Sequence, residues 1–167
     1  MQLGEDTITM SMTLNPVNEA AFQKAVQSLE TLNRAAVFHP TGTGKSCIAW
    51  KVVEAHPQTT FFWLVAGAQR LALRQAELTR YNGGILPGNV RFCDCEKLAA
   101  ATPEQWVRLG EQKPGCIVLD CYHELSAVCW AQSVQKLLRM CPQAKVLGLG
   151  VPNGAPVCAA AQELFAD

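Results

Sequence analysis

The segment His39-Pro40-Thr41-Gly42-Thr43-Gly44-Lys45-Ser46 lies between the apolar run Ala35–Phe38 and the helix-like run Cys47–Glu54. Its two glycines can adopt backbone angles that a side chain forbids, so successive N–H groups can turn inward around an anion. Lys45 adds a mobile positive charge for the outer phosphates, and the Ser46 hydroxyl can coordinate the magnesium ion that accompanies them. A helix that starts here also points its positive end at the phosphates. The segment therefore predicts a phosphate loop, residues 39–46.

The match to the phosphate-loop pattern has one departure, because the strict pattern begins with Gly and this chain has His39. The alternative is a glycine-rich turn that joins a strand to a helix without binding a ligand. Gly-Lys-Ser directly after an apolar run favours nucleotide phosphates over a plain turn. The predicted nucleotide contacts in the loop are Pro40, Thr41, Gly42, Thr43, Gly44, Lys45 and Ser46.

The composition is that of an ordinary globular protein. The 167 residues suit one domain with its own core, and 14 basic residues balance 14 acidic ones. Zero net charge argues against a strongly electrostatic nucleic-acid binder, although Arg70, Arg74 and Arg80 can form a local basic face. No apolar run approaches the roughly 20 residues that span a bilayer, and the polar, acidic start is unlike a signal peptide.

The eight cysteines show no paired C-x-x-C spacing. Several of them, such as Cys116 and Cys129, lie inside apolar runs, where a reduced thiol is a small core residue. This pattern argues against a disulfide or zinc framework and favours a reducing, cytoplasmic location.

Short apolar runs alternate with helical patterns along the chain. Strands are expected at Ala35–Phe38, Thr60–Val65, Val90–Cys93, Cys116–Leu119 and Lys145–Leu149, and helices at Asn18–Asn33, Ser46–Ala55, Ala68–Tyr81, Thr102–Gly110 and Ser126–Met140. Most of the strand candidates are apolar throughout, as strands buried on both faces are. The alternation predicts an α/β fold in three layers, with a mostly parallel sheet of five or more strands and helices on both faces. Residues 1–15 lack periodicity and are expected to be a loose lead-in to a single domain, residues 16–167.

A carboxylate stands at the end of one predicted strand, where Asp120 follows Cys116–Leu119. Ligands of a parallel sheet lie beyond the carboxyl ends of its strands. A carboxylate there can hold the water shell of a magnesium ion opposite Ser46, whereas the alternative role is an acidic cap on the next turn. The phosphate loop favours the metal role, so Ser46 and Asp120 are the predicted metal ligands, and ATP and Mg²⁺ the predicted cofactors.

The order of phosphate loop, strand-Asp-x-x-His and a final Gly-Leu segment resembles the first RecA-like domain of the DEAD/DEAH-box helicases of superfamily 2, which include restriction-enzyme translocases. The resemblance covers residues 18–156, nearly the whole chain. It implies a P-loop NTPase fold and catalytic roles for Lys45, Asp120 and His123. Phe22-Gln23 matches an aromatic-Gln pair whose amide recognises adenine in relatives, so Gln23 is a candidate base contact. A Gln on a helix is also commonly just solvated.

Three departures from this family pattern concern hydrolysis and strand binding. Cys121 stands where the resemblance places the Glu that activates the attacking water, and a thiol with a pKa of about 8.5 is mostly neutral at pH 7. The segment Gly150-Val151-Pro152 has no hydroxyl where relatives carry Ser-Ala-Thr. Asp94 stands where relatives carry a Thr that contacts a nucleic-acid phosphate, and its charge would repel that phosphate. We expect nucleotide binding to be retained and hydrolysis to be weak or lost.

Three functions agree with these features. The first is the ATP-binding domain of a helicase-like, nucleic-acid-dependent ATPase; the second is an inactive nucleotide-binding module that acts through partners. The third, a small P-loop kinase, is less favoured because no basic lid is evident. Such helicases hydrolyse ATP between two RecA-like domains, and arginine fingers in related enzymes contribute a factor of about 10³ to 10⁵. Only one such domain is evident in this sequence. The expected partners are nucleotide, DNA or RNA, and a second RecA-like domain in a longer chain or another protein, with no membrane.

Overall fold

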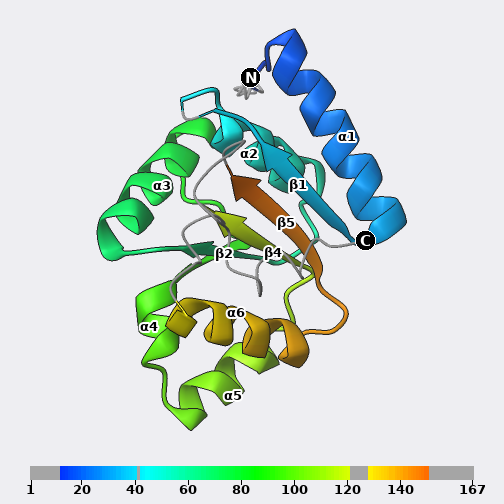
Figure 1. The fold of residues 1–167 in the computed structure, drawn as a ribbon. Helices are drawn as coiled ribbons and strands as arrows, with labels where there is room; N and C mark the ends of the chain where they lie inside the picture. Colours follow the sequence, from blue (N-terminus) through cyan, green and yellow to red (C-terminus); the bar gives the residue numbers. More distant parts are fainter. Residues whose placement is uncertain (1–11, 41, 121–127, 151–167) are drawn as a thin grey trace, which may run out of the picture.

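The protein has three layers, with a parallel sheet between two groups of helices (Figure 1). The computed structural model describes residues 12–40, 42–120 and 128–150. In chain order, the elements are α1 (Pro16–Leu32), β1 (Arg34–Phe38), α2 (Lys45–Ala55), β2 (Phe61–Val65), α3 (Ala68–Tyr81), β3 (Val90–Asp94), α4 (Cys95–Ala99), α5 (Pro103–Glu111), β4 (Cys116–Asp120), α6 (Val128–Met140) and β5 (Lys145–Gly150). The predicted α/β fold with a five-stranded sheet is confirmed. None of the helices among these residues is long and apolar enough to cross a bilayer.

The strand order is β1-β5-β4-β2-β3, and every neighbouring pair is parallel. Strand β5 therefore lies between β1, which precedes the phosphate loop, and β4, which ends at Asp120. Phe38 pairs with Gly150, and Asp120 pairs with Leu149, so the three strands end at nearly the same level. Two strand spacings, about 9.6 Å, separate β1 from β4. The sheet thus brings the loop and the carboxylate to one edge.

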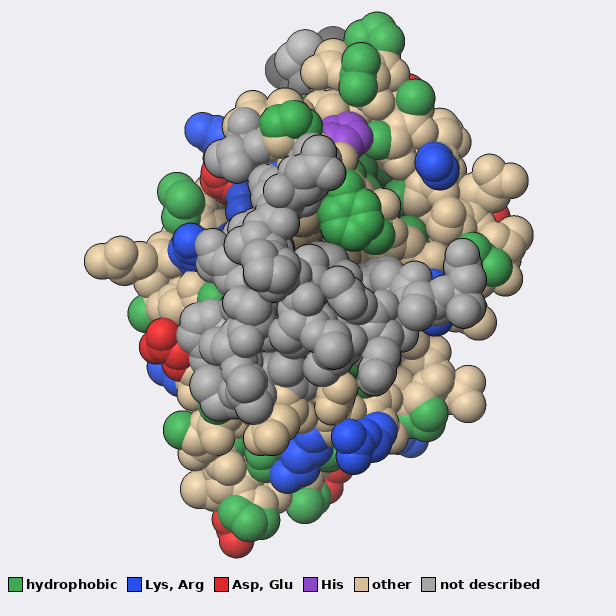
Figure 2. Space-filling view, in the orientation of Figure 1, with side chains coloured by type: hydrophobic (Ala, Val, Ile, Leu, Met, Phe, Trp, Pro, Cys, Tyr) green, Lys and Arg blue, Asp and Glu red, His purple; other side chains and the backbone are tan. Residues whose placement is uncertain are grey.

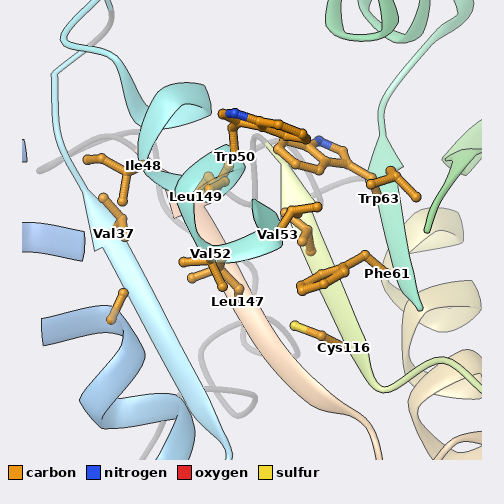
Figure 3. Packing of buried hydrophobic residues seen from close by; sticks show 14 of the residues in the cluster. Val37, Ile48, Trp50, Val52, Val53, Phe61, Trp63, Cys116, Leu147 and Leu149 are labelled. Carbon is orange, nitrogen blue, oxygen red and sulfur yellow. The ribbon is translucent and has the colours of Figure 1, made fainter. Parts of the chain in front are cut away.

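One face of the sheet packs against α1, α2 and α3. Side chains of α2, among them Ile48, Val52 and Val53, lie over those of four strands (Figure 3). The strand residues on this face alternate along each strand, as the pleat requires: Val37, Phe61, Trp63, Val65, Cys116, Val118, Leu147 and Leu149. Asp120 has the same parity as Cys116 and Val118 and therefore faces the α3 side.

The opposite face packs against α4, α5 and α6. Its strand residues include Phe62, Leu64, Ile117 and Leu119, which contact a second apolar cluster with Trp106 of α5 and Leu137 of α6. Strands β2 and β4 are buried along their whole length, which explains why they read as continuous apolar runs. Strand β1 is at the edge and alternates between buried and exposed residues.

The predicted strands and helices are all present, with ends shifted by at most two residues. One helix, α4, was not predicted. It begins because Asp94 caps it: the carboxylate accepts hydrogen bonds from the backbone N–H of Glu96 at 2.9 Å and of Gly67 at 3.2 Å. Asp94 is buried and caps α4 while tying β3 to the start of α3; its expected repulsion of a nucleic-acid phosphate stays a prediction. Residues 126–127 of the predicted last helix lie outside the described residues.

The core predicts a large difference between two leucine substitutions. We expect Leu147→Ala, at a fully buried site, to lower the free energy of unfolding by about 2–5 kcal/mol, because it removes apolar contacts and leaves a cavity. Leu73→Ala, at a site on α3 that is 59% exposed, is the matched control and should change it by less than about 0.5 kcal/mol. Urea unfolding measures both. Equal losses would contradict the assignment of Leu147 to the core.

Candidate nucleotide site

The phosphate loop connects β1 to α2 at the carboxyl edge of the sheet. Gly42 and Gly44 have φ angles of +80° and +91°, in the left-handed region that glycine adopts without strain. The Thr43 N–H and hydroxyl both donate to the Pro40 carbonyl, at 3.3 and 2.6 Å, and close the loop into a turn. Helix α2 begins at Lys45, so its N-terminal N–H groups face the loop. Thr41 lies outside the described residues.

Two contacts from other elements hold the loop in place. The His39 N–H donates to the Gly150 carbonyl of β5 at 3.1 Å. The Asn18 side chain of α1 donates from Nδ2 to the Thr43 carbonyl at 2.9 Å, and Asn18 is buried. A Cβ atom on Gly44 would lie 2.9 Å from this Nδ2, so Gly44 is needed for space as well as for its φ angle. Sequence reasoning missed Asn18, whose only signal is a polar residue on the inner face of an amphipathic helix.

Lys45 and Ser46 have protein partners in this structure. The Lys45 ammonium donates to the His39 carbonyl at 2.8 Å, so the side chain folds back along the loop. The buried Ser46 hydroxyl lies 3.4 Å from the Tyr81 hydroxyl of α3, which also accepts a hydrogen bond from the Cys47 thiol at 3.3 Å. Burial and the Cys47 contact raise the pKa of Tyr81, so the phenol keeps its proton at neutral pH.

Asp120 is 3% exposed, and its carboxylate accepts hydrogen bonds from Trp63 and Arg74. These three residues are called the carboxylate cluster below. Its Oδ2 accepts from Trp63 Nε1 at 2.9 Å and from Arg74 Nε at 2.6 Å, and its Oδ1 accepts from a terminal nitrogen of Arg74 at 3.3 Å. Arg74 also pairs with Glu77. Burial lowers the pKa of Arg74, but the charges and hydrogen bonds of Asp120 and Glu77 raise it by more, so the guanidinium stays charged.

The expected basic face of three arginines is wrong for Arg74. Its side chain points inward to Asp120 and is 20% exposed, whereas Arg70 and Arg80 are exposed. Arg80 lies over the Tyr81 ring, 5.4 Å from its centroid. The physical reason is the buried carboxylate, which needs a positively charged partner in a region of low dielectric constant.

The loop residues fit a phosphate group, whereas the surroundings of Asp120 do not fit a magnesium ion. Magnesium prefers about six oxygen ligands in octahedral geometry and keeps several of its waters. Ser46 and Asp120 offer the right atoms, but the Asp120 oxygens accept N–H donors, and a guanidinium already stands beside them. A metal between these two residues would have to displace Arg74. The metal assignment made from the sequence therefore disagrees with the arrangement of the carboxylate cluster.

The roles of two other predicted site residues stay predictions. Gln23 is exposed on α1 and donates from Nε2 to Glu19 at 2.9 Å, so its adenine contact stays a prediction. His123 lies outside the described residues, as does Cys121.

Known proteins match this chain in fold and not in sequence. Neither a family model nor a curated protein sequence matches this chain. Among solved structures, it is similar to the ATP-dependent Type ISP restriction-modification enzyme LlaBIII bound to DNA, with a TM-score of 0.55 and 14% identity over 84% of this chain. This likeness shows that the two chains share a fold over the matched region. The chain spans 13% of the length of that enzyme, and the DEAD/DEAH-box details remain a prediction.

The loop geometry predicts different effects for alanine at its two described glycines. Gly42→Ala adds backbone strain only, because nothing lies within 4 Å of its Cβ position. Gly44→Ala adds the same strain and also displaces Asn18 from Thr43, so we expect a larger loss of unfolding free energy, by about 1 kcal/mol or more. Urea unfolding of both variants measures the difference. Adding Asn18→Ala to Gly44→Ala relieves the clash and should cost little more; equal losses in the two single variants would argue against the Asn18 contact.

Proposed function

We propose that this chain is an ATP-binding domain of the helicase-like type, in which residues 39–46 bind the nucleotide phosphates. The observation that carries the proposal is the loop itself. Gly42 and Gly44 are both left-handed, and they lie between β1 and the N-terminus of α2, at the sheet edge where ligands of this fold class bind. The fold shared with an ATP-dependent enzyme agrees with this proposal.

The proposed contacts are few and specific. Backbone N–H groups of the loop and of the first turn of α2 would donate to phosphate oxygens. The Lys45 ammonium would leave the His39 carbonyl for a phosphate, because a charge-assisted hydrogen bond is stronger than one to a neutral carbonyl. Gln23 would contact the adenine base.

Hydrolysis is proposed to be weak or absent. Cys121 replaces the carboxylate expected to activate water, and the carboxylate cluster engages Asp120 with Arg74. An efficient ATPase of this type would also need a second RecA-like domain. These features favour the alternative of a nucleotide-binding module that acts through partners.

A nucleic-acid partner is proposed on weaker grounds. The solved relative is bound to DNA. On the face in Figure 2, Lys and Arg side chains gather at the lower end, where α5 and α6 lie in Figure 1, and charges of both signs mix beside α3. In the lower region, the Lys136 ammonium lies over the Trp106 ring, 4.4 Å from its centroid.

Calorimetry with ATP tests the binding proposal. We expect saturable heat for the wild-type chain and none for Lys45→Ala, because the variant lacks the ammonium that neutralises the outer phosphates. Lys97→Ala removes an exposed lysine from α4, on the opposite face of the sheet, and is the matched control with unchanged affinity. A binding heat for Lys45→Ala equal to that of the wild type would contradict the phosphate-loop assignment.

Turnover separates the two leading functions. We expect little phosphate release from ATP and no increase with single-stranded DNA, because Cys121 stands in place of the activating carboxylate and Asp120 is paired with Arg74. A DNA-stimulated rate in the same assay would instead identify a working ATPase. Cys121→Glu tests the missing carboxylate directly: a gain in rate would make it the limiting defect, whereas no gain would leave the pairing of Asp120 with Arg74 as the cause.

A further inference from the structure

One helix contacts both residues that were predicted to bind the metal. Arg74 and Tyr81 of α3 are seven positions apart, which places them on the same helix face, two turns from each other. Arg74 pairs with Asp120, and Tyr81 contacts Ser46. Leu78, between them on this face, is fully buried, so α3 is firmly packed at this position. The α3 helix therefore covers the side of the site where a magnesium ion was expected.

The Arg74 contact has the geometry of a stable ion pair with Asp120. Two guanidinium nitrogens reach the two oxygens of Asp120, and Glu77, one turn along the helix, orients the same guanidinium. Trp63 donates to the carboxylate from the neighbouring strand β2. A hydrated divalent cation would have to displace a buried, two-point ion pair from this carboxylate.

We infer that the Arg74 guanidinium, and not a divalent cation, is the counter-charge of Asp120, and that the phosphate loop binds a nucleoside triphosphate in its metal-free form. The inference rests on the proposed function. An unpaired carboxylate at this edge would repel the phosphates, which is one reason that such sites use a metal. Arg74 cancels that charge from within the protein, so the loop can accept the anion with Lys45 alone.

This arrangement separates binding from turnover. In phosphoryl transfer, a bound metal bridges the outer phosphates and neutralises the charge that develops on them. A guanidinium fixed on Asp120 leaves that function unfilled, so nucleotide would be held and not split. Cys121 stands where the activating carboxylate is expected, and this substitution also favours binding without hydrolysis. The alternative is that Arg74 leaves Asp120 when a metal–nucleotide complex binds.

Nucleotide affinity with and without metal tests the inference. We expect the wild-type dissociation constant for ATP to agree within about threefold in excess magnesium and in EDTA. Arg74→Gln uncovers Asp120, so its binding should become metal-dependent, at least about tenfold tighter with magnesium than with EDTA. Arg108→Gln removes an exposed arginine from α5, on the opposite face of the sheet, and should behave as the wild type.

The outcomes separate this inference from the proposed function. If the wild-type affinity falls about tenfold or more in EDTA, Arg74 does not replace the metal, and ATP binding itself still stands. That comparison uses only the wild-type chain, so it decides even if Arg74→Gln does not fold. If no ATP binds in either condition, the proposed function fails, and with it the claim of metal-free binding.

A terbium titration tests the carboxylate without nucleotide. Terbium seeks oxygen ligands and luminesces when a nearby tryptophan is excited, and Trp63 Nε1 lies 2.9 Å from Asp120 Oδ2. The relevant signal is the part that Asp120→Asn removes. We expect none in the wild type and a saturable signal in Arg74→Gln that is lost in the Arg74→Gln/Asp120→Asn variant. A wild-type signal that depends on Asp120 would overturn the inference, because it would show that a cation enters beside Arg74.

Discussion

The organisation of the candidate site depends on one buried ion pair, between Asp120 and Arg74. Asp120 ends the central strand of the sheet and faces the α3 side, where apolar side chains surround it. A buried carboxylate is costly unless positive charge and hydrogen-bond donors accompany it. The α3 helix meets this need by turning Arg74 inward, and β2 contributes Trp63. The orientation of α3, and the contact of its Tyr81 with Ser46, agree with that requirement.

Much of the fold could be predicted from the sequence because burial leaves a pattern. Strands covered on both faces read as continuous apolar runs, and β2 and β4 were found for this reason. The turn at residues 39–46 was predicted because its backbone angles require glycine, as the φ angles of Gly42 and Gly44 confirm. The position of β5 between β1 and β4 could not be predicted in the same way, since an apolar run carries no information about its neighbours.

The partners of polar side chains were harder to predict, because they depend on tertiary contacts. The sequence suggested that Arg74 lies on a basic face with Arg70 and Arg80, yet Arg74 is turned inward to Asp120. Its partner Asp120 is 46 residues away in the chain, so no local pattern indicates this contact. Asn18 and Asp94 show the same limit: each is a short polar residue that supports a loop or a helix start, and neither has a sequence motif that announces the contact.

The two halves of the site are built by different elements, and this has a consequence for how the function can change. The anion half comes from β1, the loop and α2, with support from α1 and β5. The carboxylate half comes from β4, β2 and α3. Tyr81 makes one polar contact between them, with Ser46 and Cys47, at 3.4 and 3.3 Å. Changes in the carboxylate half can therefore abolish metal chemistry while the loop keeps its shape, because the glycines, Asn18 and the end of β5 hold the loop without using Asp120. A domain built in this way can lose turnover while the proposed nucleotide loop keeps its shape.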